Sequence, residues 1–206
     1  MKSLKLSLLA LVVTLFAVLV QAPIASAVIV HTYNGTAAAA YAERWSCNPN
    51  LECRNRAYSP IANDCTNFVS QALVAGGFAT NVHWRPYISN WAYVQNLWLE
   101  MTTFGWIKVA AKYSGSQLAA SYTAGARGDI LMYDWGKGLR FSHMAMVTGW
   151  GERASLYASD GVGDFMSQHS TDRWRAPWNY GYRHPDSSID RARMIVWVLR
   201  STKQTL

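Results

Sequence analysis

The sequence is notable first for the patterns that it lacks. No pair of cysteines or histidines has zinc-ligand spacing, and the acidic residues do not follow the spacing of a calcium loop. These absences argue against a metal cofactor. No dense run of lysine and arginine is present, which argues against nucleic acid as a partner. We find no internal repeat and no low-complexity tail, so a single compact unit is expected.

Long apolar runs are also scarce, and one stands at the very start of the chain. Lys2 and Lys5 precede an almost wholly apolar segment, 6–20, and the small residues of segment 25–27 follow. This pattern is typical of a secretory signal peptide over residues 1–27. The alternative is an uncleaved anchor, although no basic stop-transfer cluster follows. Nothing later is long and apolar enough to span a bilayer, so no stable membrane insertion is expected after cleavage.

Removal of such a leader leaves residues 28–206, about 180 residues, which suits one domain with a sizeable core. The leader carries two lysines and no acidic residue, so the formal net charge of +7 falls to +5 without it. This basic balance suits an anionic cell-wall polymer, although it also serves solubility alone. The ten tryptophans and eleven tyrosines are mostly expected in the core, and some could line a groove for sugar rings or peptide side chains. We therefore expect a secreted, extracellular protein, with association with a cell wall as an option.

The chain has three cysteines, an odd number for an exported protein. Cys47 and Cys53 flank a loop that can bring them together, and a disulfide there would leave Cys65 unpaired. A zinc site formed by Cys47, Cys53 and a histidine is an alternative that the spacing does not support. An unpaired cysteine is either a small hydrophobic residue in the core or a nucleophile that takes part in a reaction.

Cys65 stands at the start of a predicted helix. Asp64 and Thr66 are typical of helix N-termini, apolar residues follow at helical spacing, and Gly76 ends the pattern. The positive end of a helix dipole favours the thiolate form of a cysteine. The polar neighbours of Cys65 argue against a buried, inert thiol, and the helix start favours a nucleophile.

The remaining pattern predicts an α+β fold, with helices first and strands later. Helices are expected over residues 34–45, 64–75 and 89–103, with a short one over 116–122. Strands are expected over residues 128–134, 142–149 and 193–200, and more weakly over 155–159 and 165–168, whereas 174–190 resembles a loop. The expected architecture is N-terminal helices packed on one side of an antiparallel sheet.

His143 opens one of these strands and is the candidate general base for Cys65. A thiol and an imidazole within hydrogen-bonding reach can attack an amide and then protonate the leaving group. A third polar group should hold the imidazole in place. His169 and Asp160 compete for that role, and Asp172 also lies near in sequence.

Four segments together resemble the bacterial putative amidase domain: residues 64–71, 128–130, 142–149 and 167–170. That family is grouped with the papain-like cysteine hydrolases, alongside the NlpC-type and CHAP peptidoglycan amidases. The resemblance implies Cys65 as nucleophile and His143 as base. It also favours His169 over Asp160 as the third residue. For the oxyanion, the resemblance offers Tyr58 as a nearby group, and the backbone N–H of Cys65 is the simpler donor.

The sequence thus predicts a cysteine amidase or peptidase that cleaves an amide bond, with peptidoglycan peptide as the expected substrate. No cofactor is implied, because the acyl-thioester route needs no metal. Two alternatives stay open: a non-catalytic cell-wall or glycan-binding module on the same fold, and a thiol acyltransferase of the transpeptidase or transglutaminase-like kind.

Overall fold

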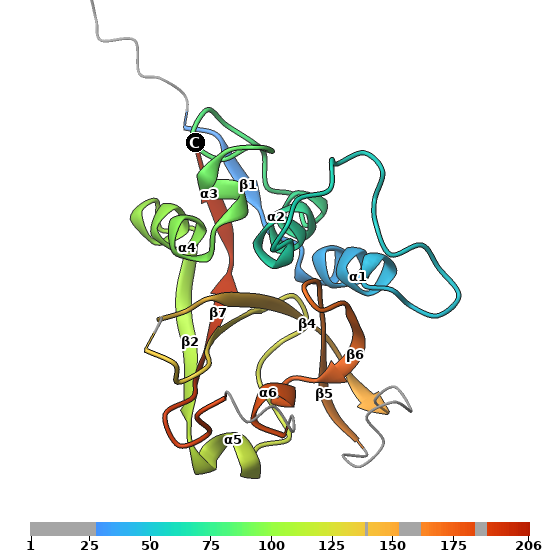
Figure 1. Cartoon of the computed structure of the whole chain (residues 1–206). Coiled ribbons are helices and arrows are strands. Elements are labelled where there is room, and N and C mark those ends of the chain that lie inside the picture. The colour runs from blue at the N-terminus through green and yellow to red at the C-terminus, as the bar shows by residue number, and fades with distance from the viewer. Residues whose placement is uncertain (1–27, 139, 153–161, 184–188) are drawn as a thin grey trace, which may run out of the picture.

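The computed structural model describes residues 28–138, 140–152, 162–183 and 189–206, and its architecture is α+β (Figure 1). The predicted fold class, helices with an antiparallel sheet, is therefore confirmed. The predicted leader, the weak strand at 155–159 and the candidate Asp160 all lie outside these residues. No helix within the described part of the chain is long and apolar enough to cross a bilayer.

Six antiparallel strands form the main sheet, in the order β2-β7-β3-β4-β5-β6. A two-stranded sheet pairs β1 with β8 near the two chain ends. The strands are β1 (Val30–Thr32), β2 (Ile107–Ser114), β3 (Ile130–Asp134), β4 (His143–Glu152), β5 (Val162–Gln168), β6 (Arg173–Pro177), β7 (Ile195–Ser201) and β8 (Lys203–Thr205). The helices are α1 (Gly35–Trp45), α2 (Cys65–Ala75), α3 (Ser89–Ala92), α4 (Val94–Thr103), α5 (Ser116–Ala120) and α6 (Tyr180–Arg183).

The larger helices gather on one side of the sheet, and α2 lies between α1 and the α3–α4 pair (Figure 1). Both α1 and α2 pack on β4. On β4, Met144 and Met146 belong to the core cluster beneath these helices, whereas Ala145 and Val147 belong to a second cluster. This alternation follows from the two-residue period of a strand. The fully buried Phe68 of α2 stabilises the packing by about 1.5–3 kcal/mol.

The helix predictions are largely confirmed. Asn34 caps α1 with its side-chain oxygen, which accepts a hydrogen bond from the backbone N–H of Ala37 at 3.0 Å. The stretch predicted over 89–103 is helical but divided, because Tyr93 between α3 and α4 has an extended backbone, with φ −114° and ψ 133°.

The strand predictions missed both edges of the main sheet. β6 lies within or beside the segment predicted as a loop, and Pro177, which cannot donate a ladder hydrogen bond, ends it at the sheet edge. β2 forms the opposite edge and is mostly exposed, so its sequence carries little apolar alternation. An edge strand has one unpaired side, so its sequence shows a weaker alternation of apolar and polar residues. Such strands are therefore harder to predict.

Candidate active site

Cys65 is the first residue of α2, and its side chain borders a cavity of about 560 Å³. Only 5% of Cys65 is exposed, and its neighbours Thr66 and Asn67 are buried as well. The polar neighbours, which argued against a buried and inert thiol, therefore do not keep Cys65 at the surface. These neighbours are buried because they have partners: Asn67 accepts a hydrogen bond from the indole of Trp91 at 2.5 Å. The thiol nevertheless faces a space that a substrate can enter.

The structure brings Cys65 and His143 together, as the sequence predicted. His143 is the first residue of β4, and β4 packs against α2. Burial alone would raise the pKa of the Cys65 thiol. The hydrogen bond and charge of His143, with smaller contributions from the Met144 backbone and the Thr66 hydroxyl, outweigh burial and lower that pKa from 9.0 to about 7. A thiol with this pKa is substantially ionised near neutral pH.

Gln168, the last residue of β5, holds the imidazole of His143. The Nε2 atom of His143 lies 2.9 Å from the Gln168 side-chain oxygen. The side-chain nitrogen of Gln168 donates to the carbonyl of Thr171 at 2.9 Å, which fixes the amide with its oxygen towards the ring. Nε2 of His143 is therefore the donor in this pair, and Nδ1 is left for the thiol. The rings of Trp135 and Tyr133 pack beside the imidazole at centroid distances of 5.6 and 5.7 Å.

His169, the residue that the family resemblance favoured for this role, does not contact His143. Its Nδ1 lies 2.5 Å from the Asp64 carboxylate and its Nε2 lies 2.7 Å from the carbonyl of Trp45. The register of β4 and β5 explains the difference. Met146 pairs with Ser167 in this antiparallel pair, and side chains alternate between the two faces of the sheet. Gln168 therefore lies on the same face as His143, and His169 lies on the face that the helices cover. The predicted third residue, His169, is therefore one position away from Gln168, the residue that contacts His143.

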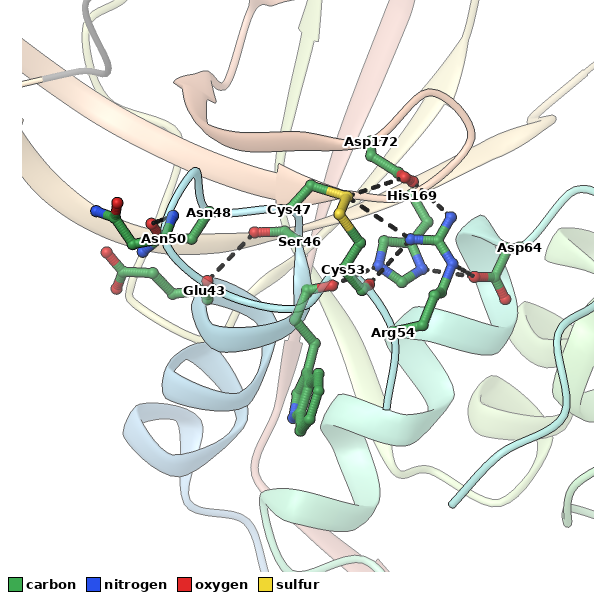
Figure 2. The surroundings of a disulfide bond; sticks show 11 residues. Glu43, Ser46, Cys47, Asn48, Asn50, Cys53, Arg54, Asp64, His169 and Asp172 are labelled. Atoms are coloured by element: carbon green, nitrogen blue, oxygen red, sulfur yellow. Dashed lines mark hydrogen bonds and ion pairs between the residues drawn. A yellow bond between two sulfur atoms is a disulfide. The ribbon is translucent and has the colours of Figure 1, made fainter. Parts of the chain in front are cut away.

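The Cys47–Cys53 disulfide is present, as predicted, and it is tied to the start of α2 (Figure 2). Arg54 makes the connection. Its guanidinium donates to the carbonyl of Cys53 at 2.9 Å, to Asp172 at 2.8 Å, and pairs with Asp64 at 3.2 Å. Asp172, another candidate for the third residue, therefore faces the disulfide loop. The two acids and Arg54 brace the turn that presents the cysteine helix.

The zinc alternative finds no support in this arrangement. Within the described ranges, the group of side chains close enough to share a metal ion is Cys47, Cys53 and Asp172. The two sulfurs are bonded to one another, so neither is available as a thiolate ligand.

Two groups were expected near the oxyanion. The backbone N–H of Cys65 belongs to the first turn of α2, where helix N–H groups have no intrahelical acceptor, so it can donate to an oxyanion. Tyr58 instead lines a separate cavity together with Asp64 and Asn67, and its ring stacks on Trp91 at 5.9 Å. The structure therefore does not bring Tyr58 to the cavity of Cys65.

Sequence reasoning missed Gln168 and Trp135, and each has a recognisable reason. Gln168 directly precedes His169 in the strand, and only the strand register separates their faces. Trp135 directly follows β3, and the pair of β3 and β4 nearest the connecting turn places Tyr133 opposite His143. Pairing the two predicted strands around their connecting turn would have placed Trp135 near the histidine.

Comparison with known proteins supports the resemblance drawn from the motifs. The family model described as "Putative amidase domain" matches residues 32–191. Two proteins of Bacillus subtilis (strain 168) are similar to this chain. "Uncharacterized protein YjcM" is 33% identical over 162 residues, which is 75% of this chain and 35% of that protein. "Uncharacterized protein YhbB" is 31% identical over 125 residues, which is 56% of this chain and 37% of that protein. The chain thus spans little more than a third of these relatives. No solved structure matches.

Proposed function

The chain belongs to the family described as "Putative amidase domain", and we propose from this membership that it is a cysteine-dependent amidohydrolase with a papain-like site. One observation carries the proposal: the Cys65 thiol, at a helix N-terminus, is hydrogen-bonded to His143, and its pKa is lowered to about 7. This is the nucleophile and base arrangement of thiol acyl transfer. Gln168 acts as the third residue, because it fixes the ring tautomer that leaves Nδ1 for the thiol.

The reaction proceeds through an acyl-thioester. The Cys65 thiolate attacks the amide carbonyl, and the backbone N–H at the start of α2 stabilises the oxyanion. The protonated His143 then gives its proton to the leaving amine as the C–N bond breaks. A water molecule, deprotonated by His143, attacks the thioester and releases the carboxylic acid, and Cys65 leaves as the thiolate. No metal or cofactor takes part in these steps.

Peptidoglycan peptide is the substrate class that we propose. The predicted leader would export the chain, and its basic balance of 19 Lys and Arg against 12 Asp and Glu suits an anionic wall polymer. An extracellular enzyme, free or associated with the wall, would meet amide bonds there. Nucleic acid is not among the proposed partners, and stable membrane insertion after leader cleavage is not part of the proposal.

The test compares the protein lacking residues 1–27 with its Cys65→Ala variant on purified peptidoglycan. Mass spectrometry would identify new amino termini or released lactyl-peptides, and the variant should release none while keeping its fold by circular dichroism. Products from the variant at the parent rate would overturn the proposal. Tight wall binding without products from either protein would favour the binding module, and conjugates formed with an added amine would favour the acyltransferase.

A further inference from the structure

A second cavity, of about 290 Å³, adjoins the cavity of Cys65. His143, Trp135 and Ser170 border both cavities, so the two form adjoining compartments on either side of the candidate base. A substrate whose amide lies at Cys65 therefore has room on both flanks of the scissile bond.

The two compartments differ in charge. The smaller one is bordered by Lys137 and Arg173, and the larger one by neutral polar groups such as Gln95 and Asn96. Neither an aspartate nor a glutamate lines either compartment among the described residues. The smaller compartment therefore places cationic side chains next to the reacting groups, and none of the described residues in its wall is acidic.

Arg173 is the better defined of the two cations. It is half-buried at the start of β6, and its guanidinium stacks on the ring of Tyr180 at 4.3 Å. Its Nε atom is buried and has no hydrogen-bond partner in the part of the chain that the structure describes. Its Nη1 atom makes a long hydrogen bond, 3.3 Å, to the carbonyl of Thr171. A stacked guanidinium with donor capacity left over is prepared for an anionic ligand.

Arg175, two residues further along the same strand, shows the contrast. It also stacks on an aromatic ring, that of Phe165 at 4.2 Å, but it has a carboxylate partner, Glu43, at 3.7 Å. It borders a separate cavity, which contains neither Cys65 nor His143. One arginine of β6 therefore has an acidic partner within the protein, and the other borders the compartment beside the candidate base.

We propose that this compartment is a subsite for a carboxylate of the amide substrate, and that Arg173 is the residue that determines this specificity. The inference rests on the proposed function. The planar guanidinium would bind the carboxylate in bidentate fashion. A substrate peptide would then bind in one direction, with its acidic group beside His143 and a neutral part next to Gln95 and Asn96. A site built to pair with a charge discriminates strongly against an analogue that lacks it.

The test uses short peptides in matched pairs, each with one free carboxylate or its carboxamide, placed in turn on the acyl side and on the leaving side of the amide. We expect the parent enzyme to prefer one carboxylate peptide about tenfold or more in kcat/KM. Arg173→Gln should reduce that preference to less than about twofold. Arg175→Gln, the matched control, should keep the preference. Equal rates on both members of every pair, or an unchanged preference in Arg173→Gln, would overturn the subsite.

Binding to the Cys65→Ala variant separates this inference from the proposed function. Titration calorimetry with the same peptides needs no turnover, and the carboxylate peptide should bind about tenfold more tightly than its carboxamide, a difference that Arg173→Gln should abolish. Selective binding without hydrolysis by the parent protein would reject the amidase and keep the subsite. Hydrolysis without selective binding or selective turnover would reject the subsite alone. Arg173→Lys keeps the charge and should retain part of the preference, which excludes misfolding as the cause.

Discussion

The pairing of Cys65 with His143 predicts how fast the thiol reacts with an alkylating reagent at each pH. Cys65 is the free cysteine, since Cys47 and Cys53 are joined, so iodoacetamide should modify one site. Its rate should rise with pH through a midpoint of about 7, the lowered pKa of the thiol. In His143→Ala the hydrogen bond and charge that lower this pKa are lost, whereas burial still raises it, so the midpoint should move up towards the ordinary value of 9.0.

The size of the effect decides which quantity to measure. At pH 7 a pKa of about 7 gives about half thiolate, whereas a pKa of 9.0 gives about 1%, roughly a 50-fold difference. The more basic thiolate is about eightfold more nucleophilic over two pKa units, because nucleophilicity follows pKa with a slope of about 0.4–0.5. For a pKa of 9.0 in the variant, the rate at pH 7 therefore falls only about sixfold, while the midpoint moves by about two units. The midpoint is the decisive observable.

The assay follows alkylation by intact mass over pH 5 to 10 for the parent, His143→Ala and His83→Ala. His83 is an exposed histidine that stacks on Phe104, so its removal should leave the midpoint at about 7. A parent midpoint near 9, or equal midpoints for the parent and His143→Ala, would refute the ion-pair reasoning. In catalysis the same ionisation should appear as an acid limb, with kcat/KM rising as pH increases through about 7.

Three further predictions concern the surroundings of the pair. Gln168→Ala should lower kcat/KM by about 10- to 100-fold because the imidazole loses its hydrogen bond, and an unchanged value would remove Gln168 from the site. Asp64→Asn should lower the free energy of unfolding by about 2 kcal/mol, measured by urea denaturation, because it removes the buried carboxylate that contacts both His169 and Arg54, and a loss below about 1 kcal/mol would contradict this. Cys47→Ser should cost about 2 kcal/mol, the closure entropy of a short loop, and equal stability of the parent with and without reductant would argue against it.

The sequence predicted the parts of the site that depend on local signals. The helix start at Cys65 and the strand that begins at His143 are both marked by neighbouring residues, and both are observed. Spacing identified the Cys47–Cys53 pair for a similar reason, because the loop between them is short.

The third residue could not be predicted in the same way, because it depends on the pairing of two strands. Gln168 and His169 are equally polar neighbours, and a register change of one residue exchanges their faces. Likewise, the charge of the compartment beside His143 comes from the turn after β3 and from the edge strand β6, two segments with weak sequence signals.

The position of β7 in the sheet has a consequence for when the protein can fold. β7 is the last strand of the main sheet in the chain, yet it lies between β2 and β3, which have no direct pairing with each other. Until residues 195–201 are available, β2 is separate from the rest of the sheet. β3 pairs with β4, the strand that begins at His143, and its other edge stays unpaired until β7 is added. Assembly of the whole sheet therefore waits until residues 195–201 are available. The nucleophile and its base lie on α2 and β4, which both precede β7, so the strand that joins the two parts of the sheet is supplied after both residues have been made.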